Sequence, residues 1–151
     1  MTHRTYEELL EELLEVSRSL VGVTMRAVAA SPVEITLAQH RALMLLGARG
    51  PQSVTQIADY LGINPSNASR LCDRLQRLDL VVRTRSADDR RVVRVDVSAV
   101  GRTVLDAVAR RRREQLAEIV DRIPEGDGAT LLAALRRLNA TVREASAPGQ
   151  R

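Results

Sequence analysis

The 151-residue sequence contains no lysine, no phenylalanine and no tryptophan, and its only aromatic residues are Tyr6 and Tyr60. Proteins that bind single-stranded nucleic acids stack the bases on aromatic side chains, so this composition disfavours an RNA-type site and leaves duplex DNA open. The single cysteine, Cys72, excludes an internal disulfide, and the two histidines, His3 and His40, complete no cluster spaced for zinc. We therefore expect no metal site and no cofactor.

Long apolar runs are also missing. No segment approaches the roughly 18 apolar residues that a membrane-spanning helix needs, and residues 1–14 are acidic rather than a basic stretch before an apolar core. We therefore expect a cytoplasmic protein with no membrane partner. The sequence has no Ser/His/acid or Cys/His set placed for nucleophilic catalysis and no glycine-rich phosphate loop after a strand. We expect no catalytic residues and no enzymatic function.

Positive charge is concentrated in the middle of the chain. All 23 cationic residues are arginines. Residues 64–113 contain 13 arginines and six acidic residues, a local charge of +7, whereas the other residues contain 10 and 13, a charge of −3. Codon bias accounts for the absence of lysine but not for this clustering. A basic centre between mildly acidic ends predicts an anionic partner that binds the centre.

The hydrophobic pattern predicts a mainly helical chain. Thr36 with Gln39 and Ser53 with Gln56 form two capping boxes, in which a hydroxyl accepts from a free N–H and the glutamine reaches back. Asn64 is a third cap, and Pro65 suits the first helical position. The predicted helices run over about 6–30, 37–49, 54–61, 65–78, 98–123 and 127–145.

Between these helices the hydrophobic period changes from helical to two. Residues 81–85 and 91–97 are rich in valine, and the polar turn 86–90 joins them, which predicts an antiparallel hairpin. A short helix, a turn containing Gly62, a second helix and a hairpin follow in the order of a winged helix-turn-helix. The predicted fold is mainly α with a small β-hairpin wing. The alternative is a small helical bundle in which Gly62 merely ends a helix.

The predicted helix over 65–78 has an apolar and a polar face. The positions expected to face inward are Ala68, Leu71, Cys72, Leu75 and Leu78. The positions expected to face outward are Ser66, Asn67, Ser69, Arg70 and Arg74. Hydroxyls and amides bind base edges or phosphates and arginine pairs bidentately with guanine, so we predict that the outward set binds DNA. For Arg74, solvation or an ion pair with Asp73 or Asp79 is an almost equal alternative.

The tip of the predicted wing carries Asp88, Asp89, Arg90 and Arg91. An aspartate two residues before an arginine fixes the guanidinium and aims it out of the turn, where a narrow, negative minor groove would receive it. We predict that Asp89 and Arg91 belong to the DNA-binding site. From position alone, a solvated turn is an equal alternative.

These segments together resemble the MarR family of bacterial winged-helix transcription regulators. The resemblance runs from about residue 36 to 101 and is carried by residues 37–43, 57–66, 70–75 and 89–91. It implies that Arg91 enters the minor groove. Where the family commonly has Leu-Thr and a glycine three residues after the threonine, this chain has Val97, Ser98 and Gly101, and Ser98 still caps a helix.

The resemblance also implies a homodimer in which the first and last helices of two protomers interlock. Two recognition helices about 34 to 36 Å apart then meet successive major grooves, which requires a palindromic operator. The apolar seams over residues 9–27 and 131–142 agree with a dimer, since a monomer would expose them. The implied domains are 1–35 (N-terminal dimerisation helix), 36–98 (winged helix-turn-helix) and 99–151 (C-terminal dimerisation helices and tail).

We interpret the protein as a dimeric, sequence-specific regulator that binds double-stranded DNA, and as a repressor. The alternative is a winged-helix module that binds an acidic protein, and steep salt dependence distinguishes duplex binding from it. The arginines at 110–113 extend the phosphate contacts or, as we favour, form a solvated helix face.

The resemblance allows release from the operator by a small-molecule effector, an aromatic or phenolic acid held between the dimer helices and the winged domain. The candidate effector-binding residues are Arg18, Met25, His40 and Arg41. A histidine placed like His40 is more often a satisfied residue on a helix surface. Cys72 lies on the inward stripe, so we expect a small buried hydrophobe rather than a redox sensor.

Overall fold

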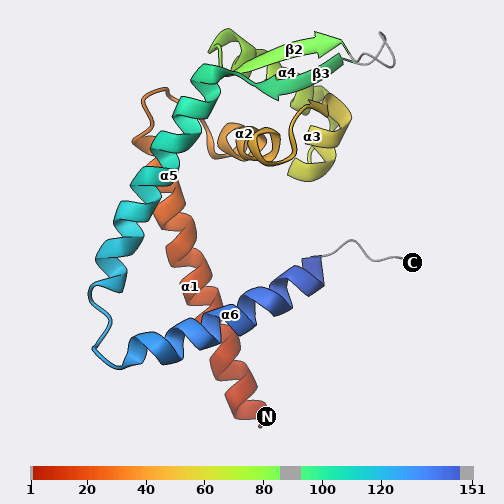
Figure 1. Ribbon diagram of the computed structural model, residues 1–151. Coiled ribbons are helices and arrows are strands. Elements are labelled where there is room, and N and C mark those ends of the chain that lie inside the picture. The colour runs from red at the N-terminus through yellow and green to blue at the C-terminus, as the bar shows by residue number, and fades with distance from the viewer. Residues whose placement is uncertain (1, 86–92, 147–151) are drawn as a thin grey trace. The chain divides into compact units, whose positions relative to one another are not determined.

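The computed structural model describes residues 2–85 and 93–146, and Figure 1 shows their arrangement. Along the chain the elements are α1 (His3–Ala29), α2 (Leu37–Arg49), β1 (Gln52–Ser53), α3 (Val54–Leu61), α4 (Pro65–Arg77), β2 (Val81–Arg85), β3 (Val93–Val97), α5 (Ala99–Val120) and α6 (Asp127–Ser146). This mainly helical fold with a small antiparallel sheet confirms the predicted fold class. In the described part of the chain, no helix is long and apolar enough to cross a membrane.

Capping side chains determine where three of the helices begin. The backbone N–H of Gln39 donates to Thr36 Oγ1 at 3.2 Å, and the backbone N–H of Thr36 donates to Gln39 Oε1 at 2.8 Å. Ser53 and Gln56 repeat this arrangement at the start of α3 with the same two distances. The side chain of Asn64 caps α4. Both predicted capping boxes and the predicted asparagine cap are confirmed.

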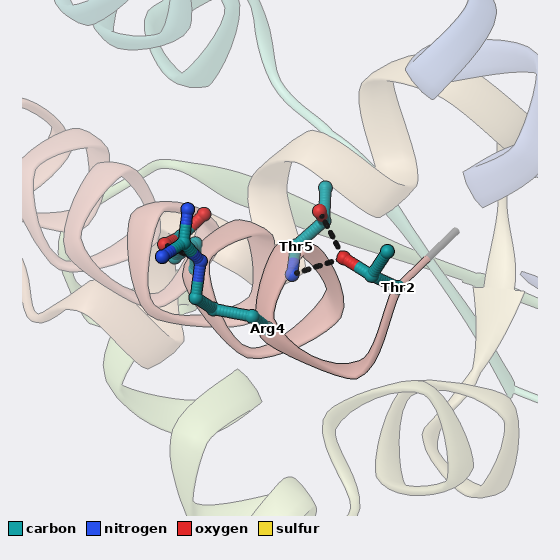
Figure 2. Close-up of polar contacts among 4 residues, drawn as sticks. Thr2, Arg4 and Thr5 are labelled. Atoms are coloured by element: carbon teal, nitrogen blue, oxygen red, sulfur yellow. Dashed lines mark hydrogen bonds and ion pairs between the residues drawn. The ribbon is translucent and has the colours of Figure 1, made fainter.

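Two helix boundaries differ from the prediction. Helix α1 begins at His3 instead of residue 6 because Thr2 caps it: Thr2 Oγ1 accepts from the backbone N–H of Thr5 at 3.3 Å and lies 2.7 Å from Thr5 Oγ1 (Figure 2). Helix α5 ends at Val120 instead of near residue 123. The backbone N–H groups of residues 122 and 123 donate to carbonyls three residues back instead of four, so the chain forms a tighter turn there and the α-helix ends.

The sheet has the strand order β1-β3-β2, and both pairings are antiparallel. Val81 of β2 pairs with Val97 of β3, and Gln52 of β1 pairs with Val95. Val95 and Val97 are buried, while Arg94 and Asp96, which alternate with them, are half-buried, so one face of β3 covers the core. The hairpin was predicted, whereas β1 was missed because two residues give no periodic signal.

One hydrophobic core joins α2, α3, α4, the sheet and the first half of α5, and the end of α1 packs into it. Helices α2, α3 and α4 and the sheet lie together in Figure 1. Its largest fully buried side chains are Leu43, Leu46, Ile57, Cys72, Leu75, Leu80, Val95, Val104 and Val108. Gly62 adopts the left-handed conformation that the turn between α3 and α4 requires, with φ 69° and ψ 35°, as predicted. The inward position predicted for Leu78 is wrong: it is 38% exposed. Helix α4 ends at Arg77, and Leu80 enters the core instead.

The start of α5 is anchored to the segment between α4 and β2. Ser98 Oγ accepts from the backbone N–H of Gly101 at 2.9 Å and donates to the backbone carbonyl of Asp79 at 2.5 Å. The backbone N–H of Ser98 donates to the carbonyl of Leu80 at 3.0 Å. Gly101 is buried so closely that an added Cβ would overlap the Leu80 carbonyl oxygen. The small residue at position 101 therefore sets how closely α5 approaches the winged region.

The chain forms two compact units, Met1–Gln115 and Leu116–Arg151. In the first, residues 2–21 of the long N-terminal segment are exposed throughout, and α1 enters the core only near its C-terminal end, at Val23, Ala27 and Val28. In the second, every α6 residue over 127–145 is exposed, including an apolar set that is 37% to 52% exposed: Leu131, Leu132, Leu135, Leu138 and Val142. The predicted three-part division at residues 35/36 and 98/99 stays a prediction.

Candidate nucleic-acid interface

Helix α4 separates its apolar and polar side chains on two faces. Ala68, Cys72 and Leu75 are fully buried and Leu71 packs against the core. Ser66, Asn67, Arg70 and Arg74 are exposed, and Ser69 is half-buried. Ser69 thus lies at the border of the polar face rather than fully on it, because it follows the buried Ala68. The remaining outward residues form the polar face of α4, and neither Arg70 nor Arg74 has an ion-pair partner within residues 2–85 and 93–146.

A shallow groove lies beside this surface, between α4 and the start of α2. Arg70, Arg74 and Asn67 border it from α4, while Thr36 and Gln39 border it from α2. Two arginines and an amide along one groove form a surface suited to phosphate oxygens, which accept hydrogen bonds from such groups. The sequence reasoning did not include Thr36 and Gln39, which it used only as capping residues.

An ion pair joins α4 to the base of the wing. Arg83 Nη2 of β2 lies 2.5 Å from Asp73 Oδ1 of α4. Within the described residues, Asp73 therefore pairs with Arg83, and the considered pair of Asp73 with Arg74 is not formed. Sequence spacing gave no signal for Arg83, because its contact with Asp73 depends on how β2 packs beside α4. The ion pair links the base of the wing to α4.

The wing tip itself, with Asp89 and Arg91, lies outside the described residues, so its predicted role stays a prediction. The strands that lead to the tip carry further arginines. Arg83 and Arg85 are exposed on β2, and Arg94 of β3 donates through Nη1 to the Pro51 carbonyl at 3.5 Å. The arginines of β2 and β3 therefore extend the positive charge of α4 along the wing.

A pocket of about 440 Å³ lies between α2 and the first part of α5. Of the four predicted effector-binding residues, His40 lines this pocket. The other three lie elsewhere: Arg18 pairs with Glu15 at 2.7 Å, Met25 is exposed, and the guanidinium of Arg41 lies 5.6 Å from the centre of the Tyr60 ring. The structure therefore does not gather the predicted set into one site.

His40 is not the satisfied surface histidine that the sequence suggested. It is 3% exposed, and its Nδ1 is buried with no hydrogen-bond partner among the described residues. Burial lowers the pKa of His40 and the nearby Arg112 guanidinium lowers it further. Arg112 is half-buried and lines the same pocket, so the interpretation of residues 110–113 as a solvated face is wrong at this position.

Comparisons with known proteins agree with this arrangement. The model of the MarR family matches residues 34–92, which cover α2, β1, α3, α4 and β2 and end just before β3. Over 106 residues the chain is 26% identical to the HTH-type transcriptional regulator YpoP of Bacillus subtilis, covering 70% of this chain and 75% of YpoP. The structure of a MarR family protein from Bacillus stearothermophilus aligns with a TM-score of 0.82 and 25% identity, covering 95% of this chain and 99% of that one. These comparisons place residues 34–92 of the chain in the MarR family.

A second solved structure extends the similarity over the whole chain. RV1404 from Mycobacterium tuberculosis aligns with a TM-score of 0.83 and 29% identity, covering 99% of this chain and 100% of its own. The 151-residue protein described above is therefore a DNA-binding transcriptional regulator with a winged-helix fold. Relatives such as YpoP are named HTH-type transcriptional regulators.

The one cysteine of the sequence lies behind the polar face of α4. Cys72 is fully buried on the inward side of α4, as predicted. Burial raises the pKa of the Cys72 thiol, although the Arg83 guanidinium acts in the opposite direction. A thiol that is buried and mainly protonated reacts slowly with oxidants, because the thiolate is the reactive form. The structure thus places Cys72 among the packing residues.

His40 is expected to make the stability of the protein depend on pH. Because its pKa is lowered in the folded state, the unfolded chain binds more protons near and below pH 6.5, the value of an unperturbed histidine. The stabilisation is complete above about pH 6.5 and decreases as the pH falls toward the lowered pKa. We expect H40Q to flatten the pH dependence of urea unfolding between pH 5 and 7. The matched variant H3Q, at an exposed position, should keep the wild-type slope, and equal slopes for all three proteins would contradict this role.

Proposed function

We propose that this MarR-family protein is a homodimeric repressor that binds a palindromic operator in double-stranded DNA through α4 and the wing. The observation that carries the proposal is the polar face of α4. Its exposed residues are Ser66, Asn67, Arg70 and Arg74, whereas Ala68, Cys72 and Leu75 on the opposite face are fully buried. A repressor role is supported by MdtR of Bacillus subtilis, named a transcriptional repressor and 29% identical over 91 residues, 60% of this chain and 59% of MdtR.

Each predicted residue takes a distinct role in this proposal. Arg70 pairs bidentately with a guanine, and Ser66, Asn67 and Ser69 bind base edges or phosphates. Arg74 binds a backbone phosphate from the groove beside α2. At the wing tip, Asp89 orients Arg91 into the minor groove. The same fold binds DNA in FabT of Streptococcus pneumoniae, which aligns with a TM-score of 0.72 and 19% identity and covers 93% of this chain and 99% of FabT.

The exposed apolar faces of α1 and α6 support the dimer. Leu9, Leu13 and Leu20 of α1 are exposed in the single chain, as are Leu131 and Leu135 of α6. Apolar faces of this extent on two long helices are typical of interfaces between copies of a chain. A second copy related by twofold symmetry would bury them and would place two copies of α4 on one duplex.

Titration of duplex DNA from upstream of the protein's own gene tests this proposal. We expect two protomers per duplex by sedimentation, and an affinity that falls linearly with the logarithm of salt concentration. R91A should weaken binding about tenfold and reduce the salt slope by about one, because one phosphate-proximal cation is lost. R113A, which removes an exposed arginine of α5, is the control. Salt-insensitive binding would favour the alternative module for an acidic protein, and unchanged binding by R91A would exclude the wing contact.

We include release by a small-molecule effector in the same proposal. The support is the pocket between α2 and α5, whose volume lies within the usual range for small-molecule sites. The same fold carries bound p-coumaroyl-CoA in CouR of Rhodococcus jostii, which aligns with a TM-score of 0.73 and 20% identity and covers 99% of each chain.

A further inference from the structure

We propose that His40 is a pH-dependent switch of DNA binding: protonation of its imidazole separates α2 from α5 and weakens the DNA surface that α4 forms with the start of α2. The inference deepens the proposed function, on which its consequence for DNA binding rests. The separation of the helices itself involves no DNA. His40 and the part of α5 that faces it belong to one compact unit, so a single protomer contains the switch.

The imidazole of His40 is enclosed beside a cation. The residue is 3% exposed, and its Nδ1 is buried with no hydrogen-bond partner in the described part of the chain. Arg112 of α5 lines the same pocket, and its Nε is likewise buried and unpaired among the described residues. A charged imidazole only donates hydrogen bonds, as a guanidinium does, so the two groups cannot bond to each other. Protonation of His40 therefore places a second cation beside the first.

The charged groups that face His40 all come from α5. Arg102, Asp106 and Arg112 line the pocket, and within the described residues α1, α3 and the rest of α2 add no charged side chain to this lining. Two arginines and one aspartate sum to +1, and an imidazolium raises the sum to +2. Asp106 favours the charged imidazole, but it is exposed and screened by water. Burial and Arg112 act in the opposite direction and lower the pKa of His40, so the imidazole is neutral near pH 7.

Separation of α2 from α5 relieves the cost of the charged imidazole. A pocket of about 440 Å³ already lies between the helices, with Met44 and Ala109 exposed at it. Movement of α2 away from α5 lets water reach the imidazole, whose pKa then returns toward its ordinary value of 6.5. The open arrangement therefore binds the proton more tightly and gains population as the pH falls below about 6.5. Above that pH both arrangements hold a neutral imidazole, and the pH has no effect.

Two consecutive residues of α2 connect this pocket to the DNA surface. His40 faces α5, whereas Gln39 borders the groove that Arg70 and Arg74 of α4 also border. Gln39 is 6% exposed, and its Oε1 accepts from the backbone N–H of Thr36 at 2.8 Å. A displacement of α2 at His40 must also displace Gln39, because the two residues are neighbours in one helix. Protonation on one side of α2 thus changes the groove on its other side, where the two arginines of α4 are expected to meet DNA.

The composition of the chain makes the switch testable by pH titration. The sequence contains two histidines, and His3 is exposed at the start of α1, so few groups other than His40 titrate between about pH 7.5 and 5.5. The full-length protein is titrated with the upstream duplex over this range at one fixed salt concentration. We expect the affinity to be constant down to about pH 6.5 and to fall about fivefold or more by about pH 5.5. H40Q should bind equally at every pH, and H3Q should respond as the native protein does.

Arg112 and its neighbour provide a second, matched pair of variants. R112M removes the cation beside the imidazole and should reduce the pH response, whereas R113M, on the exposed side of α5, should keep it. Hydrogen exchange of the DNA-free protein, corrected for the pH dependence of the intrinsic rates, measures the separation of the helices. Protection over residues 37–49 and 99–112 should decrease below about pH 6.5 in the native protein but not in H40Q.

Three results would overturn the inference: equal pH responses of DNA binding in H40Q and the native protein, equal responses in R112M and R113M, or exchange over α2 and α5 that does not depend on His40. Constant DNA affinity despite the expected change in exchange would overturn the coupling through Gln39. Failure of the proposed function looks different. If the native protein binds the duplex at no pH while its exchange still depends on His40, DNA binding is rejected and the separation of α2 from α5 is supported.

Discussion

Replacing Gly101 by alanine is expected to lower the free energy of unfolding by about 3 kcal/mol or more, the upper end of overpacking effects. The new Cβ would overlap the Leu80 carbonyl oxygen and lie 2.8 Å from Val97 Cγ2. The carbonyl cannot move away easily, because it accepts from the backbone N–H of Ser98. Removing the overlap therefore requires α5 to move away from the segment between α4 and β2, and this movement breaks the hydrogen bonds of Ser98. Urea unfolding followed by circular dichroism measures the loss.

The matched control is Gly128, which also lies in the first turn of a helix. No atom lies within 4 Å of an alanine Cβ built there. G128A should be neutral or should stabilise the protein by about 0.5 to 1 kcal/mol, because alanine is the better helix former. Similar losses in both variants would show that a general intolerance of alanine, rather than the contact with Leu80, sets the effect.

The second large effect is expected at Arg70. R70A should weaken binding to the operator by about 1 to 3 kcal/mol, or roughly 5- to 150-fold, with the loss concentrated at one base pair. The reason is that the exposed guanidinium of Arg70 lies on the polar face of α4, beside Asn67 and next to the groove that Arg74 also borders. Binding to a set of operators that differ at single base pairs, measured at one fixed salt concentration, provides the test.

R70K separates base recognition from charge. Lysine keeps the positive charge but lacks the planar fork that binds two acceptors of guanine. We expect R70K to retain affinity for unrelated duplex DNA and the salt slope, and to lose discrimination at the same base pair as R70A. If R70K discriminates as well as the native protein at every position, then Arg70 acts through charge alone and its assignment to a base is wrong.

Features encoded by neighbouring residues were predictable from the sequence. The capping boxes of Thr36 and Ser53 and the left-handed turn at Gly62 depend on local hydrogen bonds and backbone sterics, so they hold whatever packs around them. The buried face of α4 followed from helical periodicity. The prediction failed at Leu78 because the end of a helix, and not its periodicity, decides which way its last residue faces.

Features that depend on packing between distant segments were not predictable in the same way. The position of Arg83 against Asp73 and the burial of His40 both depend on tertiary contacts. For Arg112, however, the sequence did hold a signal. Val104 and Val108 precede it at spacings of four and are fully buried, so the next position on that face also turns toward the core. Four adjacent arginines concealed this, because the run was interpreted as one unit.

The ion pair between Asp73 and Arg83 connects helix α4 to the base of the wing, so the spacing between these two elements is part of how the protein would select its DNA site. In the proposed complex one element reads a major groove and the other the adjoining minor groove, and the ion pair holds the base of the hairpin at a set offset from α4. Each base pair inserted between the two contacted positions would displace the second by about 3.4 Å along the helix axis, and by about a tenth of a turn around it. Operators for this protein should therefore tolerate changes of base within a half-site far better than changes of its length.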